Sequence, residues 1–330
     1  MDGPADSPAG VSGLLAPAHR IRSAIETVIT GKSEVVRIAL TVLLAEGHLL
    51  IEDVPGVGKT MLAKALGRAV DCAVSRVQFT PDLLPSDITG VSVYHQQRRE
   101  FEFRPGPVFA NIVLGDEINR ASPKTQSALL ECMQEGQTTI DGSTYRLPRP
   151  FLVVATQNPI EMEGTYALPE AQRDRFMARL SVGYPSREAE VEMLDRQEAA
   201  DPLAHLSPVT DVEQVVGMVD VTRRLYAAPG IKQYVIELVD ATRHDPMLRL
   251  GASPRAAIQL LRAAKANAAM AGRDHVLPDD VQDLAEPVLA HRLLASTDAR
   301  LSGRSVTETL AALVARTRVP SGRAAAPDRR

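Results

Sequence analysis

The chain has 330 residues, of which 45% are hydrophobic and 24% charged, an ordinary composition for a globular protein with one large core or two moderate ones. A net charge of −4, 4% aromatic residues and no Trp argue against general attraction to nucleic acid and against a stacking platform for single strands. Two cysteines and seven scattered histidines argue against a disulfide framework and a zinc motif.

The two ends of the chain have a biased composition. Residues 1–17 and 320–330 are rich in small residues and Pro, so we expect both segments to be disordered. No apolar run approaches the length of a membrane span, and the N-terminus has no basic-then-apolar signal pattern. We therefore expect a cytoplasmic protein with no membrane insertion.

The segment between His48 and Met61 has the order that a phosphate-binding loop requires. A strand expected over 48–53 leads into a Gly-rich turn, and apolar residues at helical spacing follow. The strict motif begins with Gly, whereas this chain has Asp53 at that position. The expected nucleotide-binding residues are Pro55, Gly56, Val57, Gly58, Lys59, Thr60 and Met61.

The residue types in this loop suit a nucleoside triphosphate. Gly56 and Gly58 allow backbone N–H groups to approach phosphate oxygens without a Cβ in the way. Lys59 supplies a point charge for the β- and γ-phosphates, and Thr60 supplies a hydroxyl ligand for Mg²⁺. We expect ATP and Mg²⁺ to bind here.

A second motif lies at the end of a strand expected over 112–116. Asp116 can hold Mg²⁺ through water, and Glu117 can take a proton from an attacking water molecule. An apolar run that ends in two acids can also be a strand that leaves the core into solvent. Its combination with a phosphate loop favours the catalytic interpretation.

A third motif is Asn158, which follows a strand expected over 151–156. Its amide is both donor and acceptor, so it could orient the attacking water, although Asn-Pro also commonly begins a turn. Further strands are expected over 75–80 and 178–183. The alternation of strands and helices predicts an α/β domain over 18–186 with a mostly parallel sheet.

Two segments that interrupt this alternation are expected to be hairpins. Residues 88–108 alternate polar and apolar side chains around a charged centre. Residues 136–147 contain Asp141-Gly142, a strong turn signal. Both hairpins could contact a partner or could be surface decorations.

Residues 187–319 show a helical pattern, which predicts a second, smaller domain. Ser253 and Pro254 fit the cap and first residue of one helix, which places Arg255 in its first turn. A cation is unfavourable there unless an anion such as a γ-phosphate faces it. Helices are expected over 187–200, 211–226, 231–244, 254–271 and 278–296.

In this order the motifs resemble those of the MoxR family of AAA+ ATPases, over about residues 20–300. The matching blocks are DVPGVGKT, DEINRA, SPKTQSALLECMQE, ATQNP and EGTYALPEAQRDRF. The resemblance implies an AAA+ P-loop parallel-sheet domain followed by a smaller all-helical lid. It also implies roles for the matching residues, with Lys59 and Thr60 as Walker A, Asp116 and Glu117 as Walker B, Asn158 as sensor 1, Arg175 as the arginine finger given to a neighbouring subunit, and Arg255 as sensor 2.

The resemblance extends to three further features. The segment Val28–Lys32, which includes Ile29, corresponds to the family segment near the adenine. Arg173 stands where the family more often has an apolar residue, so Arg173 and Arg175 are both candidates for the finger. The two hairpins correspond to the helix-2 insert and to the hairpin before sensor 1, which face the pore or a partner in such rings.

The function that the resemblance implies is Mg-ATP hydrolysis coupled to the remodelling or maturation of client proteins. The implied assembly is a homo-hexamer with an adaptor that carries a von Willebrand factor type A domain. Three alternatives stay open: a nucleic-acid motor, which the acidic balance disfavours, a metal-chelatase motor subunit, and a nucleotide-gated scaffold with negligible turnover.

Overall fold

The computed structural model describes residues 10–54, 56–158, 166–184, 187, 190–191 and 202–320. Its centre is a five-stranded parallel sheet with the strand order β2-β5-β8-β1-β9. This confirms the predicted α/β class, and β9 alone ends well before its predicted end at residue 183. The strands are β1 (Leu49–Glu52), β2 (Val74–Gln78), β5 (Ile112–Asp116), β8 (Leu152–Gln157) and β9 (Ala178–Leu180).

Each face of the sheet is covered by a different hydrophobic cluster, because alternate residues of a strand point to opposite faces. Leu49 and Ile51 belong to one cluster, and Leu50 between them belongs to the other. The first cluster contains α1 (Gly10–Glu26), α2 (Ser33–Leu44), α3 (Lys59–Ala69) and the lid helices. The second contains α5 (Pro123–Glu135) and residues near α4 (Pro85–Thr89), η1 (Pro107–Phe109) and η2 (Ile118–Arg120).

Helix α1 corrects one expectation. Residues 1–17 were expected to be disordered, but the chain is helical from Gly10, and residues 1–9 lie outside the described part. Leu14, Ala18 and Ile21 are buried at helical spacing in the first cluster. Packing of this stripe outweighs the composition bias, which by itself indicates only weak local structure.

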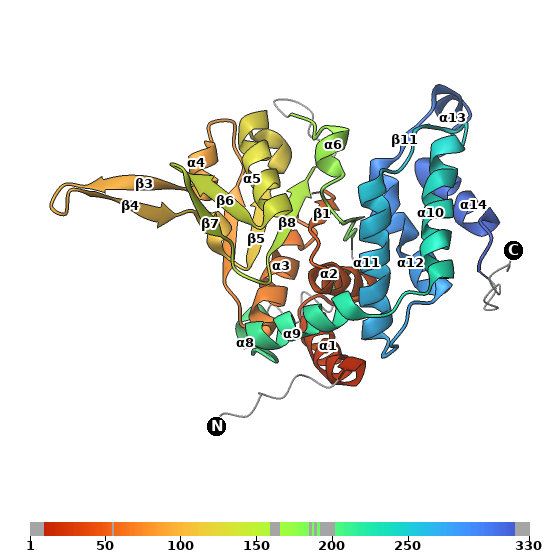
Figure 1. Ribbon diagram of the computed structural model, residues 1–330, viewed down its shortest axis with the longest axis horizontal. Helices are drawn as coiled ribbons and strands as arrows, with labels where there is room; N and C mark the ends of the chain where they lie inside the picture. Colours follow the sequence, from red (N-terminus) through yellow and green to blue (C-terminus); the bar gives the residue numbers. More distant parts are fainter. Residues whose placement is uncertain are drawn as a thin grey trace, which may run out of the picture.

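The second part of the chain is a helical lid, as predicted, and Figure 1 shows its helices after residue 228 on the opposite side of the molecule from the hairpins. The helix expected over 278–296 was predicted too long, because the chain turns into η3 (Ala290–Arg292) and then into β11 (Leu294–Ala295), which pairs with β10 (Leu248–Leu250). The lid helices are α8 (Pro202–His205), α9 (Val212–Arg224), α10 (Pro229–His244), α11 (Pro254–Met270), α12 (Pro278–Leu289), α13 (Thr297–Leu301) and α14 (Val306–Arg316).

Two expectations about this part fall outside the described residues, namely most of the helix over 187–200 and the tail beyond residue 320. The cap of α11 is as predicted, since Ser253 Oγ accepts a hydrogen bond from Ala256 N at 3.2 Å. The lid does not form a separate core. Its buried residues belong to the same cluster as α1, α2 and α3.

Both predicted hairpins are present, and neither belongs to the central sheet. One is formed by β3 (Gly90–His95) and β4 (Glu100–Pro105), and the other by β6 (Gln137–Ile140) and β7 (Ser143–Arg146). The β3–β4 hairpin extends away from the α/β part on the side remote from the lid (Figure 1). Phe103 stacks on Tyr145 with ring centroids 4.1 Å apart, which joins the two hairpins. No described helix is long and apolar enough to cross a membrane.

Candidate functional site

The predicted phosphate loop lies between the end of β1 and the start of α3. Gly56 and Gly58 have φ of 88° and 89°, in the left-handed region that favours glycine. No heavy atom lies within 4 Å of a Cβ built on either residue, so the backbone faces open space. Gly58 is the N-cap of α3, whose free N–H groups and positive dipole end suit an anion. Pro55 lies outside the described residues.

Asp53 connects this loop by hydrogen bonds to the segment that follows β9. Lys59 Nζ donates to Asp53 O at 2.7 Å. The Asp53 carboxylate accepts from Val54 N at 2.8 Å, Ser181 Oγ at 2.9 Å and Gly183 N at 2.6 Å. Burial by itself would raise the pKa of Asp53, but these hydrogen bonds outweigh it and lower the pKa. The departure from the strict motif at Asp53 was the sequence signal for this contact, although its partners were not predicted.

Asp116 ends β5 as predicted and is buried. Its Oδ2 accepts from Arg76 Nε at 2.7 Å, and its Oδ1 accepts from Thr156 Oγ1 at 3.3 Å. Arg76 and Thr156 were not predicted as site residues. They reach Asp116 from the two strands that flank β5, so only the strand order reveals them.

Glu117 has left-handed backbone angles of φ 58° and ψ 50°, which for a non-glycine residue cost about 1–3 kcal/mol and are common at active sites. Its backbone N–H donates to Thr156 Oγ1 at 3.0 Å. Its carboxylate accepts from Gln78 Nε2 at 2.9 Å and pairs with Arg120 Nε at 3.1 Å. Thr156 Oγ1 is therefore bonded both to the side chain of Asp116 and to the backbone of Glu117.

Asn158 follows β8 and is buried. Because β8 lies between β5 and β1, Asn158 is at the same sheet edge as the acids and the phosphate loop and lies between them. Ile29 is buried in the core cluster against which Val57 and Met61 also pack. The phosphate loop, the two acids and Asn158 thus lie at one edge of the sheet, whereas the shared cluster spans the whole core and does not place Ile29 at this edge.

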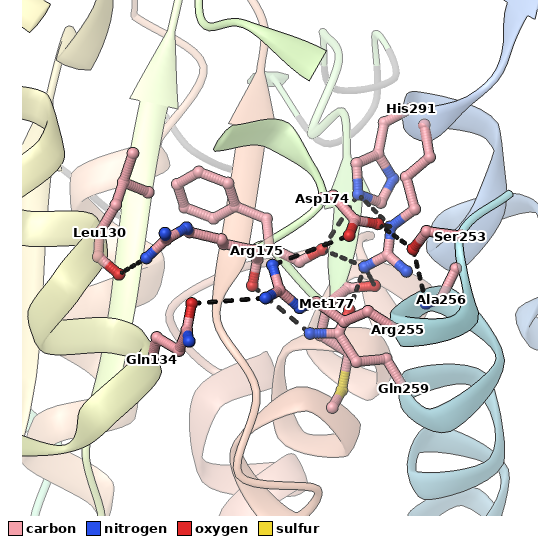
Figure 2. Close-up of polar contacts among 12 residues, drawn as sticks. Leu130, Gln134, Asp174, Arg175, Met177, Ser253, Arg255, Ala256, Gln259 and His291 are labelled. Atoms are coloured by element: carbon pink, nitrogen blue, oxygen red, sulfur yellow. Dashed lines mark hydrogen bonds and ion pairs between the residues drawn. The ribbon is translucent and has the colours of Figure 1, made fainter. Parts of the chain in front are cut away.

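Arg175 lies at the opposite edge of the sheet, where the parallel strands begin. It precedes β9, which runs parallel to β1, whereas the phosphate loop follows β1. Four residues of β1 at about 3.3 Å each separate the two edges by roughly 13 Å. Arg175 Nη1 donates to Leu130 O on α5 at 2.6 Å (Figure 2). Arg175 therefore cannot reach the phosphate loop of its own chain.

Arg255 lies beside Arg175 rather than beside the phosphate loop of its own chain. Its Nη2 donates to Gln134 Oε1 on α5 at 3.4 Å, and its Nη1 is 3.7 Å from Asp174 Oδ2 (Figure 2). The start of α11 therefore lies next to Asp174 and α5, and not next to the phosphate loop of the same chain. Arg173 Nε is buried with no hydrogen-bond partner among the described residues.

Arg175 and Arg255 line one basic cavity of about 610 Å³. Three more arginines, Arg146, Arg149 and Arg262, face the same cavity, and Glu46 and Glu135 are its acids. Arg149 and Arg262 both pair with Glu46, at 3.0 and 3.3 Å. The cavity is lined by residues from α5, from the segments that precede the sheet strands and from the lid. Its excess positive charge suits an anion.

The chain is similar to known proteins over most of its length. A family model described as "ATPase family associated with various cellular activities (AAA)" matches residues 48–178, and a model of the AAA lid domain matches residues 240–313. The chain is 48% identical over 301 residues to YeaC, an uncharacterized protein of Bacillus subtilis, with coverage of 91% of this chain and 94% of YeaC. It is 44% identical over 304 residues to the chaperone MoxR1 of Mycobacterium tuberculosis, with coverage of 88% and 80%. A solved structure of a proposed ATPase from Cytophaga hutchinsonii superposes with a TM-score of 0.88 at 38% identity, with coverage of 94% and 97%.

Proposed function

Because this chain belongs to the MoxR family of AAA+ ATPases, we propose that it hydrolyses Mg-ATP in a ring of identical subunits and uses the hydrolysis to remodel client proteins. One observation carries the proposal: the phosphate loop and the Arg175–Arg255 pair lie at opposite edges of one parallel sheet. A site that needs both is incomplete in a single chain. Two adjacent copies in a ring would complete it.

At the first edge, Gly56–Thr60 would bind the ATP phosphates, and Ile29 would lie near the adenine. Thr60 and Asp116 would hold Mg²⁺, which neutralises charge on the β- and γ-phosphates when it is bound. Glu117 would accept a proton from the attacking water, which Asn158 would orient. The positive-φ glycines, the open space around them and the buried Asp116 carboxylate support this assignment.

At the second edge, Arg175 and Arg255 would stabilise developing charge on the γ-phosphate of a neighbouring subunit. An arginine finger contributes about 10³–10⁵ in rate, so an isolated subunit should be slow. Arg175 is the better candidate for the finger than Arg173, because Arg175 lines the basic cavity. A homo-hexamer is the assembly that we propose from the family.

Client contact would involve the β3–β4 hairpin and a separate adaptor with a von Willebrand factor type A domain. Tyr94 and Phe101 lie on the same face of the hairpin with ring centroids 5.2 Å apart, and they are 49% and 72% exposed. Exposed aromatic pairs of this kind are typical of protein-contact surfaces. We propose that the ring works in the cytoplasm.

Two substitutions test the nucleotide site. Lys59→Ala should abolish most ATP binding, because it removes the cation at the loop. Glu117→Gln should keep ATP binding and lower kcat by about 10²–10⁴-fold, because it removes only the base. Binding of a fluorescent ATP analogue and phosphate release are measured in parallel. Normal turnover by Glu117→Gln would end the assignment of Glu117 as the base.

A mixing experiment tests the shared site. Arg175→Ala and Lys59→Ala subunits should each be inactive alone, and their mixture should regain activity where an intact loop meets an intact finger. No recovery in rings shown to be mixed would refute action across the subunit boundary. Stimulation of the ATPase activity by DNA would instead favour a nucleic-acid motor. Stimulation by tetrapyrrole partners would favour a chelatase motor. Binding of ATP with negligible turnover in assembled rings would favour a nucleotide-gated scaffold.

A further inference from the structure

Arg292 is a buried arginine of the lid that bonds to the backbone of the segment carrying Arg175. It lies in η3 and is 4% exposed. Its Nη2 donates to Phe176 O at 2.5 Å, lies 3.5 Å from Met177 O and also donates to Gln259 Oε1. Burial lowers the pKa of Arg292 to about 10, although the nearby Asp174 opposes this, so Arg292 stays charged at neutral pH.

Asp174, directly before Arg175, ties the same segment to the lid through its side chain. Its Oδ1 accepts from Ser253 Oγ at 2.8 Å and lies 3.6 Å from Arg292 Nε. Its Oδ2 lies 3.7 Å from Arg255 Nη1. The lid therefore holds this segment by its backbone and by its side chain, next to the start of α11 (Figure 2).

This network connects the two segments that carry Arg175 and Arg255, which come from different parts of the molecule. Arg175 belongs to the α/β part and Arg255 to the lid, and both line the basic cavity. Gln259 makes a second connection between the two segments. Its Nε2 donates to Arg175 O at 3.5 Å, and its Oε1 accepts from Arg292. A charge as buried as that of Arg292 is costly to desolvate, so its position is determined by these partners.

We infer that Arg292 is a positioning residue that clamps the Arg175 segment to the lid, so that Arg175 and Arg255 reach the nucleotide of a neighbouring subunit together. The inference rests on the proposed shared site. It predicts that Arg175 moves together with the lid. It also predicts that loss of Arg292 impairs the finger that a subunit donates and spares the phosphate loop of the same subunit.

The test is Arg292→Gln, which keeps a polar side chain and removes the guanidinium. A misplaced catalytic group costs about 10²-fold in rate, so kcat should fall by about that factor with little change in the KM for ATP. Mixing Arg292→Gln with Lys59→Ala subunits should restore activity, because the intact loop of the first meets the intact finger of the second. Arg304→Gln, which changes an exposed lid arginine, is the matched control and should behave as wild type.

The outcomes separate the inference from its premise. Wild-type kcat in Arg292→Gln overturns the inference. So does low activity without recovery on mixing, if the Arg175→Ala and Lys59→Ala pair does recover. If neither pair recovers, the shared site itself is wrong and the inference falls with it.

A thermal melt shows whether Arg292→Gln is folded. If it is not, Gln259→Ala replaces it, because this half-buried residue contacts both Arg292 and Arg175. A lower kcat that mixing with Lys59→Ala restores supports the clamp. Wild-type kcat in Gln259→Ala overturns it.

Discussion

Asp53 shows how one side chain can replace the glycine of a phosphate-loop motif. Its carboxylate accepts three hydrogen bonds, two of them from the segment that leaves β9. Asp53→Asn should lower the free energy of unfolding by about 1–3 kcal/mol, because the amide replaces an accepting oxygen with an NH₂ donor that faces existing N–H and O–H donors. Chemical denaturation measures this. Asp71→Asn, at an exposed site, is the control, and equal losses in both variants would contradict the prediction.

His48 makes the fold sensitive to acid. It is buried before β1, where it lies 3.0 Å from Met133 O through Nε2 and accepts from Val153 N at 3.1 Å through Nδ1. Burial lowers the pKa of His48 to about 4, from an unfolded value of about 6.5. Between these values only the unfolded chain binds the proton, so acidification over this range should lower the free energy of unfolding by about 3 kcal/mol.

Urea unfolding at pH 7.5 and pH 4.5 measures this loss in the wild type and in His48→Gln. The variant should be less stable at pH 7.5 and should show a smaller loss on acidification, because it has no imidazole to protonate. Burial also lowers the pKa of His291, so part of the loss should persist. His244→Gln, at an exposed histidine, is the control. An unchanged pH dependence in His48→Gln would refute the role of this side chain.

At the scale of elements, the β3–β4 hairpin depends on a close backbone contact at its base. Gly90 has φ 97°, and a Cβ at this residue would lie 2.3 Å from Arg104 O and 2.6 Å from Gly106 N. Gly90→Ala should therefore disrupt the pairing of β3 with β4. Hydrogen exchange should show lost protection confined to residues 91–104, with ATP binding unchanged, because the phosphate loop is formed by other elements. Ser92→Ala is the control, and full protection in Gly90→Ala would contradict the prediction.

At the scale of the whole molecule, Glu46 joins the α/β part to the lid. Its carboxylate lies 3.0 Å from Arg149, 2.5 Å from Arg223 on α9 and 3.3 Å from Arg262 on α11. Burial by itself would raise the pKa of Glu46, but the three arginines, led by Arg223, lower it. The stability that Glu46 contributes is therefore present above the pKa of the unfolded side chain and lost as the pH falls through the folded value.

Glu46→Gln should lower the free energy of unfolding by about 1–3 kcal/mol, because three cations lose their shared anion. It should also increase hydrogen exchange in α9 and α11, where the lid meets α2. Glu102→Gln, at an exposed position on the β3–β4 hairpin, is the control. The prediction fails if Glu46→Gln unfolds like wild type and α9 keeps its protection.

The sequence by itself determined the local chemistry of this protein. The phosphate loop, the acid pair and Asn158 each follow an apolar strand, and the Asp141-Gly142 turn specifies its own hairpin, so a short window of residues contains the whole signal. The parallel sheet followed from the alternation of strands and helices, and the helical lid followed from apolar residues at helical spacing. These features depend on neighbours in the chain, which a sequence shows directly.

Only the tertiary structure decided which of these parts meet. The order β5-β8-β1 places Asn158 between the acids and the loop, and the edge at which Arg255 lies depends on how the lid packs. The bond from Arg292 to Phe176 spans 116 positions of the chain. Helix α1 packs in a core whose other residues come from distant segments of the chain. Periodicity shows which faces are apolar but not which surfaces cover them, because packing between distant segments depends on the shape and charge of both partners at once.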